Sequence, residues 1–365
     1  MEMREYYPRV EVYLSKLRNN IDQIQSRCRE QGVEVAGVIK GFNGIVECAK
    51  EFESAGCQYI ATSRIEQLRA VKESGIKTPL MLIRIPMLSE VDEVVRLADI
   101  SLNSSPRVLI ELNKAAKKQN KVHDVILMVD LGDLREGLWN KQEMQNVASL
   151  VEDALKNLKL AGVGTNLGCY GSIEPTVEKL EELVECAEMI EAKIGRKLDV
   201  ISGGASTSMP RIFDKNIPER INQLRIGEAI INAKDSRDLF GYDMSFMFQD
   251  AFVLMGEVIE VETKPSYPVG EICYDAFGMK KEYKDSGMRR KALLALGKVD
   301  YAFPDMIYPR EKGIEVMGAS SDHTILDIED VEREIEVGDI VDFNLCYATI
   351  VFATNSPNVK IVIKN

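Results

Sequence analysis

Polar and glycine residues that could do chemistry stand at the ends of short apolar runs in the first part of the chain. In chain order they are Lys40, Arg135, Asn166, Ser202, Gly204, Ser206, Arg225 and Gly227. A lysine amine can form a Schiff base with an aldehyde, and small residues between a strand and a helix turn backbone N–H groups toward an anion. If these residues meet at one end of a sheet, they favour covalent binding of a phosphorylated aldehyde. Pyridoxal 5'-phosphate is the obvious candidate. The competing candidate is an aldolase with a barrel fold, although the Schiff-base lysine of such an enzyme usually lies on a later strand.

Lys40 ends the apolar run Glu34–Gly41 and opens into a turn that contains Asn43 and Gly44. The run is short and rich in valine, which predicts a buried strand of a parallel sheet. A lysine at the carboxyl end of such a strand stands where α/β folds place chemistry. It could also simply leave the sheet and meet water, and residues 202–208 could form only a flexible turn and a helix cap.

The elements that would position these residues repeat along the chain. Short apolar runs lie at 35–39, 58–62, 79–84, 99–102, 124–130, 159–164, 198–202 and 223–227. Helical stretches lie between them, near 44–55, 64–74, 89–96, 106–119, 141–157, 174–195 and 205–213. Strict alternation predicts a parallel sheet, and eight units match a (β/α)8 barrel of the TIM type better than an open sheet. The carboxyl ends of the strands would then form the catalytic face, with the usual phosphate site in the last two loops.

The pattern changes after about residue 240. Strand-like runs separated by Gly, Pro, Asp and Asn turns lie at 252–261, 290–296, 314–317, 324–328, 340–343, 348–352 and 359–363. They predict a mainly β domain at 241–365, after a barrel domain at 15–240. The alternating run before it predicts a strand at 9–14, so that residues 1–14 would join the β domain, and Ser15 is a candidate cap for the helix that follows to about Arg29.

Bulk composition excludes several classes of protein. The chain has 365 residues, a net charge of −12 and no basic block, so nucleic acid and anionic membranes are not expected partners. It shows no apolar run that could span a bilayer and no apolar amino-terminal segment, which predicts a cytoplasmic protein. Seven scattered cysteines suit reduced thiols, and only two histidines exclude a His-rich metal site, so no metal centre is expected.

Several longer strings resemble the fold-type III pyridoxal-phosphate enzymes, the alanine racemase superfamily. They are Val38–Gly41, Val129–Gly137, Leu224–Gly227 and Ala319–His323. The strings Met81–Met87 and Val269–Gly278 add a closer resemblance to the subgroup of ornithine racemases. The likeness spans nearly the whole chain.

The resemblance implies a role for each matching residue. Lys40 would be the cofactor lysine, Arg135 would lie near the cofactor hydroxyl, Arg225 would face the pyridine nitrogen, and Gly227 would help to hold phosphate. It also implies a homodimer in which Ser321 and Asp322 reach the substrate in the partner's active site. The implied activity is racemisation of a free amino acid, with ornithine favoured over lysine or alanine. A pyridoxal-phosphate homeostasis protein and a fold-type III decarboxylase of basic amino acids are competing hypotheses on the same barrel.

Racemisation removes the Cα proton on one face and returns a proton on the other, so two bases are expected. Lys40 would be one. For the second we consider His323, then Tyr347, then Lys298, because the family's tyrosine is replaced by Lys298 in this chain. The lysine that the family often carries on its fifth strand is Met128 here. A basic substrate would also need a carboxylate for its terminal amine, and the candidates are Asp133, Glu136, Glu228, Asp275 and Asp322.

Overall fold

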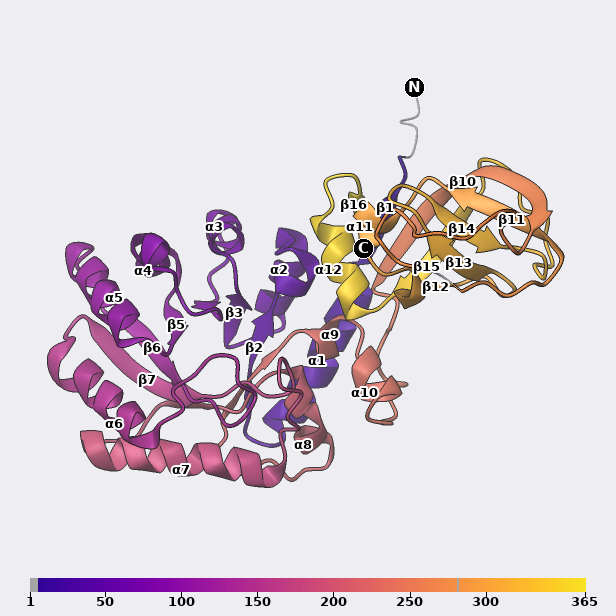
Figure 1. Cartoon of the computed structure of the whole chain (residues 1–365). Helices are drawn as coiled ribbons and strands as arrows, with labels where there is room; N and C mark the ends of the chain where they lie inside the picture. The colour runs from indigo at the N-terminus through magenta and orange to yellow at the C-terminus, as the bar shows by residue number, and fades with distance from the viewer. Residues whose placement is uncertain (1–5, 281) are drawn as a thin grey trace. The chain divides into compact units, whose positions relative to one another are not determined.

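A computed structural model describes residues 6–280 and 282–365 of the chain. The chain divides into two compact units (Figure 1). One unit is formed by Leu17–Phe248, and the other by the described residues of 6–16 and 249–365. The limits that the sequence predicted, residues 14 and 240, fall a few residues before these divisions.

The first unit is a closed barrel of eight parallel strands, as predicted. The strands are β2 (Glu34–Val38), β3 (Tyr59–Thr62), β4 (Leu80–Leu82), β5 (Ile100–Asn103), β6 (His123–Met128), β7 (Leu158–Gly164), β8 (Val200–Ser202) and β9 (Gln223–Ile226). Each strand pairs with the next, and β9 pairs with β2 to close the ring, so that Arg225 lies opposite Ala36. The first and last strands of the barrel are therefore neighbours.

Helices lie outside the strands of the barrel (Figure 1). They are α1 (Leu14–Arg29), α2 (Val46–Ser54), α3 (Ile65–Glu73), α4 (Val91–Leu97), α5 (Pro106–Lys118), α6 (Lys141–Ser149), α7 (Val177–Ile194), α8 (Met209–Phe213), α9 (Glu228–Ile231) and α10 (Lys234–Asp238). Helix α5 shows why such segments fold: Pro106 occupies its first turn, and its apolar residues recur at helical spacing on the buried side. The cap predicted at Ser15 is wrong, because α1 begins at Leu14, directly after the last residue of a strand.

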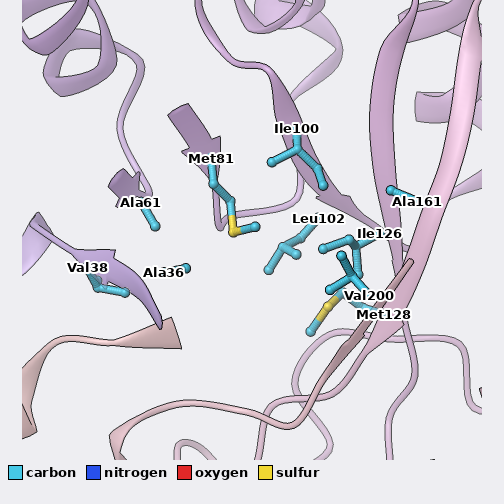
Figure 2. Close-up of a cluster of buried hydrophobic side chains, with 10 residues drawn as sticks. All are labelled: Ala36, Val38, Ala61, Met81, Ile100, Leu102, Ile126, Met128, Ala161 and Val200. Atoms are coloured by element: carbon cyan, nitrogen blue, oxygen red, sulfur yellow. The ribbon is translucent and has the colours of Figure 1, made fainter. Parts of the chain in front are cut away.

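The interior of the barrel is filled by side chains that alternate along its strands. Figure 2 shows ten of them, from Ala36 and Val38 on β2 to Val200 on β8. Met128 belongs to this set and is fully buried. Gly37 points the other way, because a Cβ atom built there would lie 2.1 Å from the ring of Phe52 on α2. The interior is therefore a packed core, and chemistry is confined to the rim.

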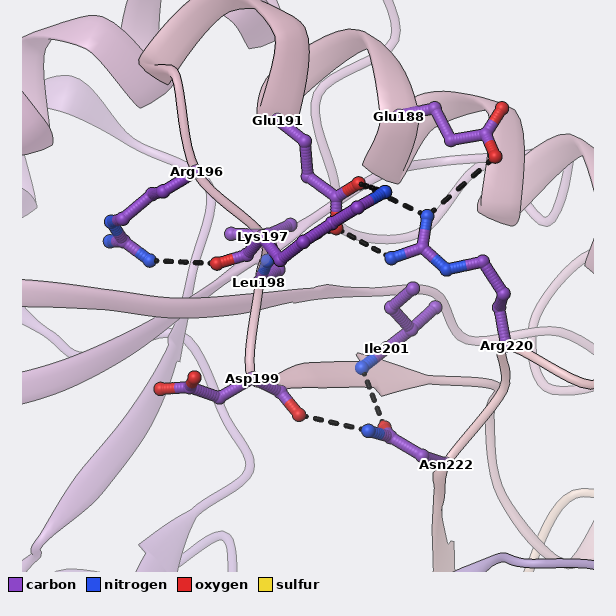
Figure 3. Close-up of polar contacts among 9 residues, drawn as sticks. All are labelled: Glu188, Glu191, Arg196, Lys197, Leu198, Asp199, Ile201, Arg220 and Asn222. Carbon is purple, nitrogen blue, oxygen red and sulfur yellow. Dashed lines mark hydrogen bonds and ion pairs between the residues drawn. The ribbon is translucent and has the colours of Figure 1, made fainter.

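At the amino-terminal ends of β8 and β9, a polar cluster fastens α7 to the barrel (Figure 3). The Glu191 carboxylate accepts hydrogen bonds from Arg220 at 2.6 Å, Lys197 at 2.7 Å and the Leu198 backbone N–H at 3.0 Å. Asn222 accepts from the Ile201 N–H and donates to the Asp199 carbonyl, both at 2.8 Å. Because the cluster lies at the opposite end of the strands from Lys40, we assign it to stability.

The second unit is mainly β structure. Its strands are β1 (Arg9–Tyr13), β10 (Phe252–Pro265), β11 (Met288–Leu294), β12 (Ile307–Pro309), β13 (Glu315–Ala319), β14 (Thr324–Asp327), β15 (Ile340–Leu345) and β16 (Lys360–Lys364). The amino-terminal strand β1 pairs antiparallel with β10 and parallel with β16, so it joins this unit. Two helices, α11 (Lys298–Tyr301) and α12 (Tyr347–Asn355), accompany the strands.

The strand predicted at 348–352 is wrong, since this segment is part of α12. Its β-branched residues favour a strand, but Thr349 accepts a hydrogen bond from the Cys346 N–H at 3.0 Å and caps the first turn. Ile350 and Ala353 then pack on the buried side of the helix. Within the described residues, none of the helices combines the length and the apolar character that crossing a membrane requires.

Candidate functional site

Lys40 begins a short 3-10 turn at the carboxyl end of β2. The turn reverses through Asn43 and Gly44, whose φ angles are 54° and 67°. The Asn43 side chain accepts a hydrogen bond from Gln67 at 3.0 Å, and Gln67 also contacts Thr62 at the end of β3. The turn that carries Lys40 is thus fixed to the neighbouring strand.

The amine of Lys40 is partly withdrawn from water and lies among charged groups. Burial lowers its pKa, and the guanidinium groups of Arg135 and Arg225 lower it further, whereas Cys169 and Glu136 oppose the shift. A lowered pKa enlarges the neutral fraction of an amine at a given pH, and the neutral amine is the nucleophile. Lys40 is therefore suited to attack a carbonyl carbon.

Arg225 lies on β9 and is only 4% exposed. It donates one hydrogen bond to the Ser202 hydroxyl at 2.5 Å and one to the Thr165 carbonyl oxygen at 2.6 Å. Among the described residues no carboxylate pairs with it. Burial lowers its pKa to about 10, so the group remains a cation at neutral pH. A buried cation without a counterion suits an electron-rich or anionic ligand.

The small residues after β8 form a tight turn beside β9. Gly204 has a φ angle of 112°, and a Cβ atom there would lie 2.7 Å from the hydroxyl oxygen of Ser208. The Ser206 hydroxyl accepts hydrogen bonds from the backbone N–H groups of Gly227 and Ala229, both at 3.2 Å. Ser206 therefore joins the turn after β8 to the backbone after β9, so that the last two loops of the barrel meet at this point.

The loop after β7 carries a second set of donors. The Asn166 Nδ2 atom is buried and has no hydrogen-bond partner among the described residues. The preceding residue, Thr165, accepts the Arg225 bond through its carbonyl and donates through its hydroxyl to the Val129 carbonyl at 2.9 Å. An orphaned buried amide costs free energy unless a ligand completes it.

The loops after β6 and β7 are held together by Asp133, which is 1% exposed. Its carboxylate accepts from the backbone N–H groups of Cys169 at 3.1 Å and Tyr170 at 3.0 Å. Burial alone would raise the pKa of Asp133, but these backbone donors outweigh it and the pKa is lowered. Arg135 donates to the Cys169 sulfur at 2.7 Å and also binds Glu136.

Four of the residues predicted in the β unit lie around one turn, namely Lys298, Ser321, Asp322 and His323. The backbone N–H groups of Lys298 and Val299 donate to the carbonyls of Ser320 and Ser321, at 2.9 and 3.0 Å. The Ser321 hydroxyl donates to Asp322 at 2.5 Å.

The candidate second bases lie in this unit. His323 is exposed and lies 3.5 Å from the Ser320 hydroxyl. Tyr347 is the first residue of α12. Lys298 lies over the Phe277 ring at 4.0 Å. The structure places the barrel candidates at one rim and the β-unit candidates in the other unit.

Two participants were missed by sequence reasoning. Thr165 acts through its backbone carbonyl, which no residue type reveals. Cys169 stands after the sixth apolar run, and its position there was the available signal. The donors at the rim, namely Lys40, Arg135, Arg225 and the unpartnered Asn166 amide, fit a group that brings both a carbonyl carbon and negative charge.

Comparison with known proteins places the chain in a family. Residues 12–234 match the model of the alanine racemase N-terminal domain. The chain is 40% identical to an ornithine racemase of Acetoanaerobium sticklandii over 345 residues, which cover 94% of this chain and 96% of that protein. It is 36% identical to a lysine racemase of Thermotoga maritima over 354 residues, covering 97% of this chain and 98% of that protein.

Solved structures support the same fold. The alanine racemase of a D-cycloserine-producing Streptomyces lavendulae superposes with a TM-score of 0.79 at 17% identity, covering 99% of this chain and 98% of that chain. The alanine racemase of Streptomyces coelicolor superposes with a TM-score of 0.76 at 18% identity, covering 98% of both chains. At this identity the likeness concerns the barrel and the β unit as a fold.

Proposed function

This chain belongs to the alanine racemase family, and we propose that it interconverts the L and D forms of ornithine with pyridoxal 5'-phosphate as cofactor. One observation carries the proposal. Lys40 lies at the barrel rim, where two guanidinium groups lower the pKa of its amine, and the chain is 40% identical to an ornithine racemase along almost its full length.

The rim residues have distinct parts in holding the cofactor. Lys40 would bind its aldehyde carbon, and the Gly204–Ser206 turn with the Gly227 N–H would hold its phosphate. Arg135 and Asn166 would donate to its remaining acceptors, and Arg225 would donate to the ring nitrogen. When bound, the cofactor withdraws electrons from the Cα atom of the amino acid and makes the Cα–H bond more acidic.

Arg225 would also control protonation at the site. A guanidinium group has only donors and keeps its protons. Even with its pKa lowered to about 10, Arg225 is charged at neutral pH. An acceptor atom that faces it therefore receives a hydrogen bond and stays unprotonated, which moderates electron withdrawal and limits side reactions.

Proton transfer at the Cα atom would use one base on each face. The Lys40 amine, with its lowered pKa, would serve one face. The other base would come from the β unit of a partner subunit, and His323 is the first candidate because it belongs to the Ala319–His323 string and an imidazole can both accept and donate a proton. Tyr347 and Lys298 follow. In this proposal the active enzyme is a homodimer, with Ser321 and Asp322 reaching the substrate.

Lysine is the second candidate substrate, because the chain is also 36% identical to a lysine racemase. Lysine and ornithine differ by one methylene, which changes binding in an apolar pocket only modestly. A homeostasis protein would bind the cofactor without turnover, and a decarboxylase would release carbon dioxide. Both are distinguished from a racemase by the product.

The test pairs two lysine substitutions on purified protein supplied with pyridoxal 5'-phosphate. We expect the wild type to gain the absorption of a lysine-bound cofactor near 420 nm, a general property of such complexes, and to convert L-ornithine to a racemic mixture on chiral chromatography. Lys40→Ala should lose both, and Lys50→Ala, at an exposed position on α2, should lose neither. Wild type without the band, or Lys40→Ala with an unchanged band, would overturn the proposal.

A further inference from the structure

A diamino acid brings a terminal ammonium group that needs a carboxylate at the site. Of the five candidates, Asp322 lies in the β unit and already accepts a hydrogen bond from the neighbouring Ser321 hydroxyl at 2.5 Å. The structure separates the other four carboxylates by the partners that each one already has. The two carboxylate oxygens of Asp133 accept hydrogen bonds from the backbone N–H groups of Cys169 and Tyr170. Without these two bonds the loop after β7 would lose its attachment. Asp133 is therefore occupied by the fold, and at 1% exposure its remaining acceptor positions are closed to a solute.

Two more candidates are occupied in comparable ways. Glu228 accepts from the backbone N–H of Asp235 at 3.2 Å, and burial raises its pKa to about 8, so much of it is uncharged at neutral pH. Asp275 accepts from the backbone N–H groups of Phe277 and Met279, both at 2.9 Å, and holds its own loop. Neither is a free anion for a ligand.

Glu136 differs from these because its described hydrogen bonds come from one flexible side chain. Arg135 donates to one carboxylate oxygen through Nε and to the other through Nη2. A carboxylate oxygen has two acceptor positions, so each oxygen of Glu136 retains one. The Glu136 side chain is 18% exposed, which leaves it within reach of a solute.

The Glu136 carboxylate is held in place by Arg135, which is itself held by further contacts. Arg135 is held on its other side by the Cys169 sulfur at 2.7 Å, and Cys169 is held in turn by Asp133. Glu136 follows β6, and its negative charge acts on both Lys40 and Arg225, so the carboxylate belongs to the same rim as these two residues. The chain of contacts thus presents a preorganised anion beside the cofactor lysine.

We propose that Glu136, oriented by Arg135, is the residue that selects a diamino acid by accepting hydrogen bonds from its terminal ammonium group. This inference rests on the proposed racemase function and assigns its specificity. The Arg135 pair is retained when the ammonium binds, so no buried charge is left without a partner. A substrate with a methyl group in place of the ammonium would leave the free acceptor positions of Glu136 desolvated and unpaired.

The experiment compares L-ornithine with L-norleucine, which has a methyl group in place of the terminal ammonium. We expect Glu136→Gln to lower the ratio of kcat/KM for ornithine to that for norleucine by about 10- to 100-fold, as loss of a hydrogen bond to a charged group implies. Glu136→Asp should recover part of the ratio. Asp153→Asn, at an exposed position before β7, removes one negative charge outside the rim and should leave the ratio unchanged.

A binding measurement separates this inference from the racemase function. Calorimetric titration of the cofactor-loaded protein with each amino acid should show weaker ornithine binding in Glu136→Gln by the same factor. An unchanged ratio in both measurements, or an equal loss for both ligands, would overturn the role of Glu136. Wild type that binds ornithine better than norleucine but racemises neither would overturn the proposed function and leave binding to decide on Glu136.

Discussion

Arg225 on β9 donates a 2.6 Å hydrogen bond to the backbone carbonyl oxygen of Thr165, at the end of β7. The same guanidinium group binds the Ser202 hydroxyl at the end of β8. One buried side chain therefore fixes the carboxyl ends of three neighbouring strands, and it does so with two separate nitrogen atoms.

Replacing Arg225 with lysine should lower the rate of racemisation by at least about tenfold. The donors of a lysine ammonium group all lie on one nitrogen atom, so it cannot reach both the Ser202 hydroxyl and the Thr165 carbonyl as the planar guanidinium group does. The measurement is kcat on L-ornithine with saturating cofactor. Arg107→Lys, at an exposed position on α5, is the matched control. Equal rates for wild type and Arg225→Lys would show that the fork geometry is not needed.

Lys40 should be the lysine that reacts first with a carbonyl reagent. Its pKa is lowered by burial and by Arg135, so a larger neutral fraction is present at pH 8 than for an ordinary lysine. Treatment of cofactor-free protein with a limiting amount of pyridoxal and borohydride, followed by peptide mass spectrometry, gives the order of labelling. The exposed Lys50 is the internal reference, and labelling of Lys50 ahead of Lys40 would contradict the expectation.

Buried His123 should make the protein less stable in mild acid. It is 2% exposed, lies 2.8 Å from the Ser101 hydroxyl, and has its pKa lowered by burial to about 4. A lowered histidine pKa means that the unfolded chain binds the proton more readily, so stability is full above about pH 6.5 and falls toward pH 4.

The loss attributable to His123 should reach about 3 kcal/mol. Urea unfolding at several pH values measures it. The slope between pH 4 and 6.5 should flatten in His123→Gln and persist in His323→Gln, since His323 is exposed. The same slope in all three proteins would rule out His123 as the source.

Glu191 should control stability in a more acidic range. Burial alone would raise the pKa of its carboxyl, but hydrogen bonds from Arg220 and Lys197 prevail and lower it to about 2. A depressed carboxyl pKa contributes stability above the unfolded value near 4.5, and that contribution is lost as pH falls toward 2. Its size is about 3 kcal/mol.

Glu191→Gln should therefore be less stable than wild type at pH 7 and nearly as stable at pH 2.5, by chemical unfolding. Glu143→Gln, at an exposed position on α6, should match the wild type at both. A stability difference that does not depend on pH would point to packing and away from charge.

The barrel was predictable because its signal is periodic. Each of the eight apolar runs became a strand, since a strand buried on both faces leaves a continuous apolar segment in the sequence. The helix at 347–355 was not predictable from its residue types, because a side-chain cap and burial of Ile350 override β-branched composition. Such tertiary contacts outweigh the strand propensity of individual residues.

The rim was predictable in position but not in contacts. Strand ends locate Lys40 and Arg225, because parallel strands bring their carboxyl ends to one face. The partners of Arg225 could not be read in advance, since one is a backbone carbonyl and the other depends on the register of β8 and β9. Whether Glu136 is available to a ligand likewise depends on which of the other carboxylates accept hydrogen bonds from the loops. The spacing of residues in the sequence does not reveal those bonds.

The pairing of β9 with β2 has a consequence for how the enzyme is made. Lys40 leaves the ribosome early, and Arg225 follows only after six further strands, β3 to β8, have been synthesised. Until β9 arrives, β2 and β8 are open edges that can pair with other chains. Closure therefore brings Lys40 and Arg225 to one rim and removes the two unpaired strand edges in a single step, so a nascent chain completes this rim only when the barrel no longer offers an edge to other chains.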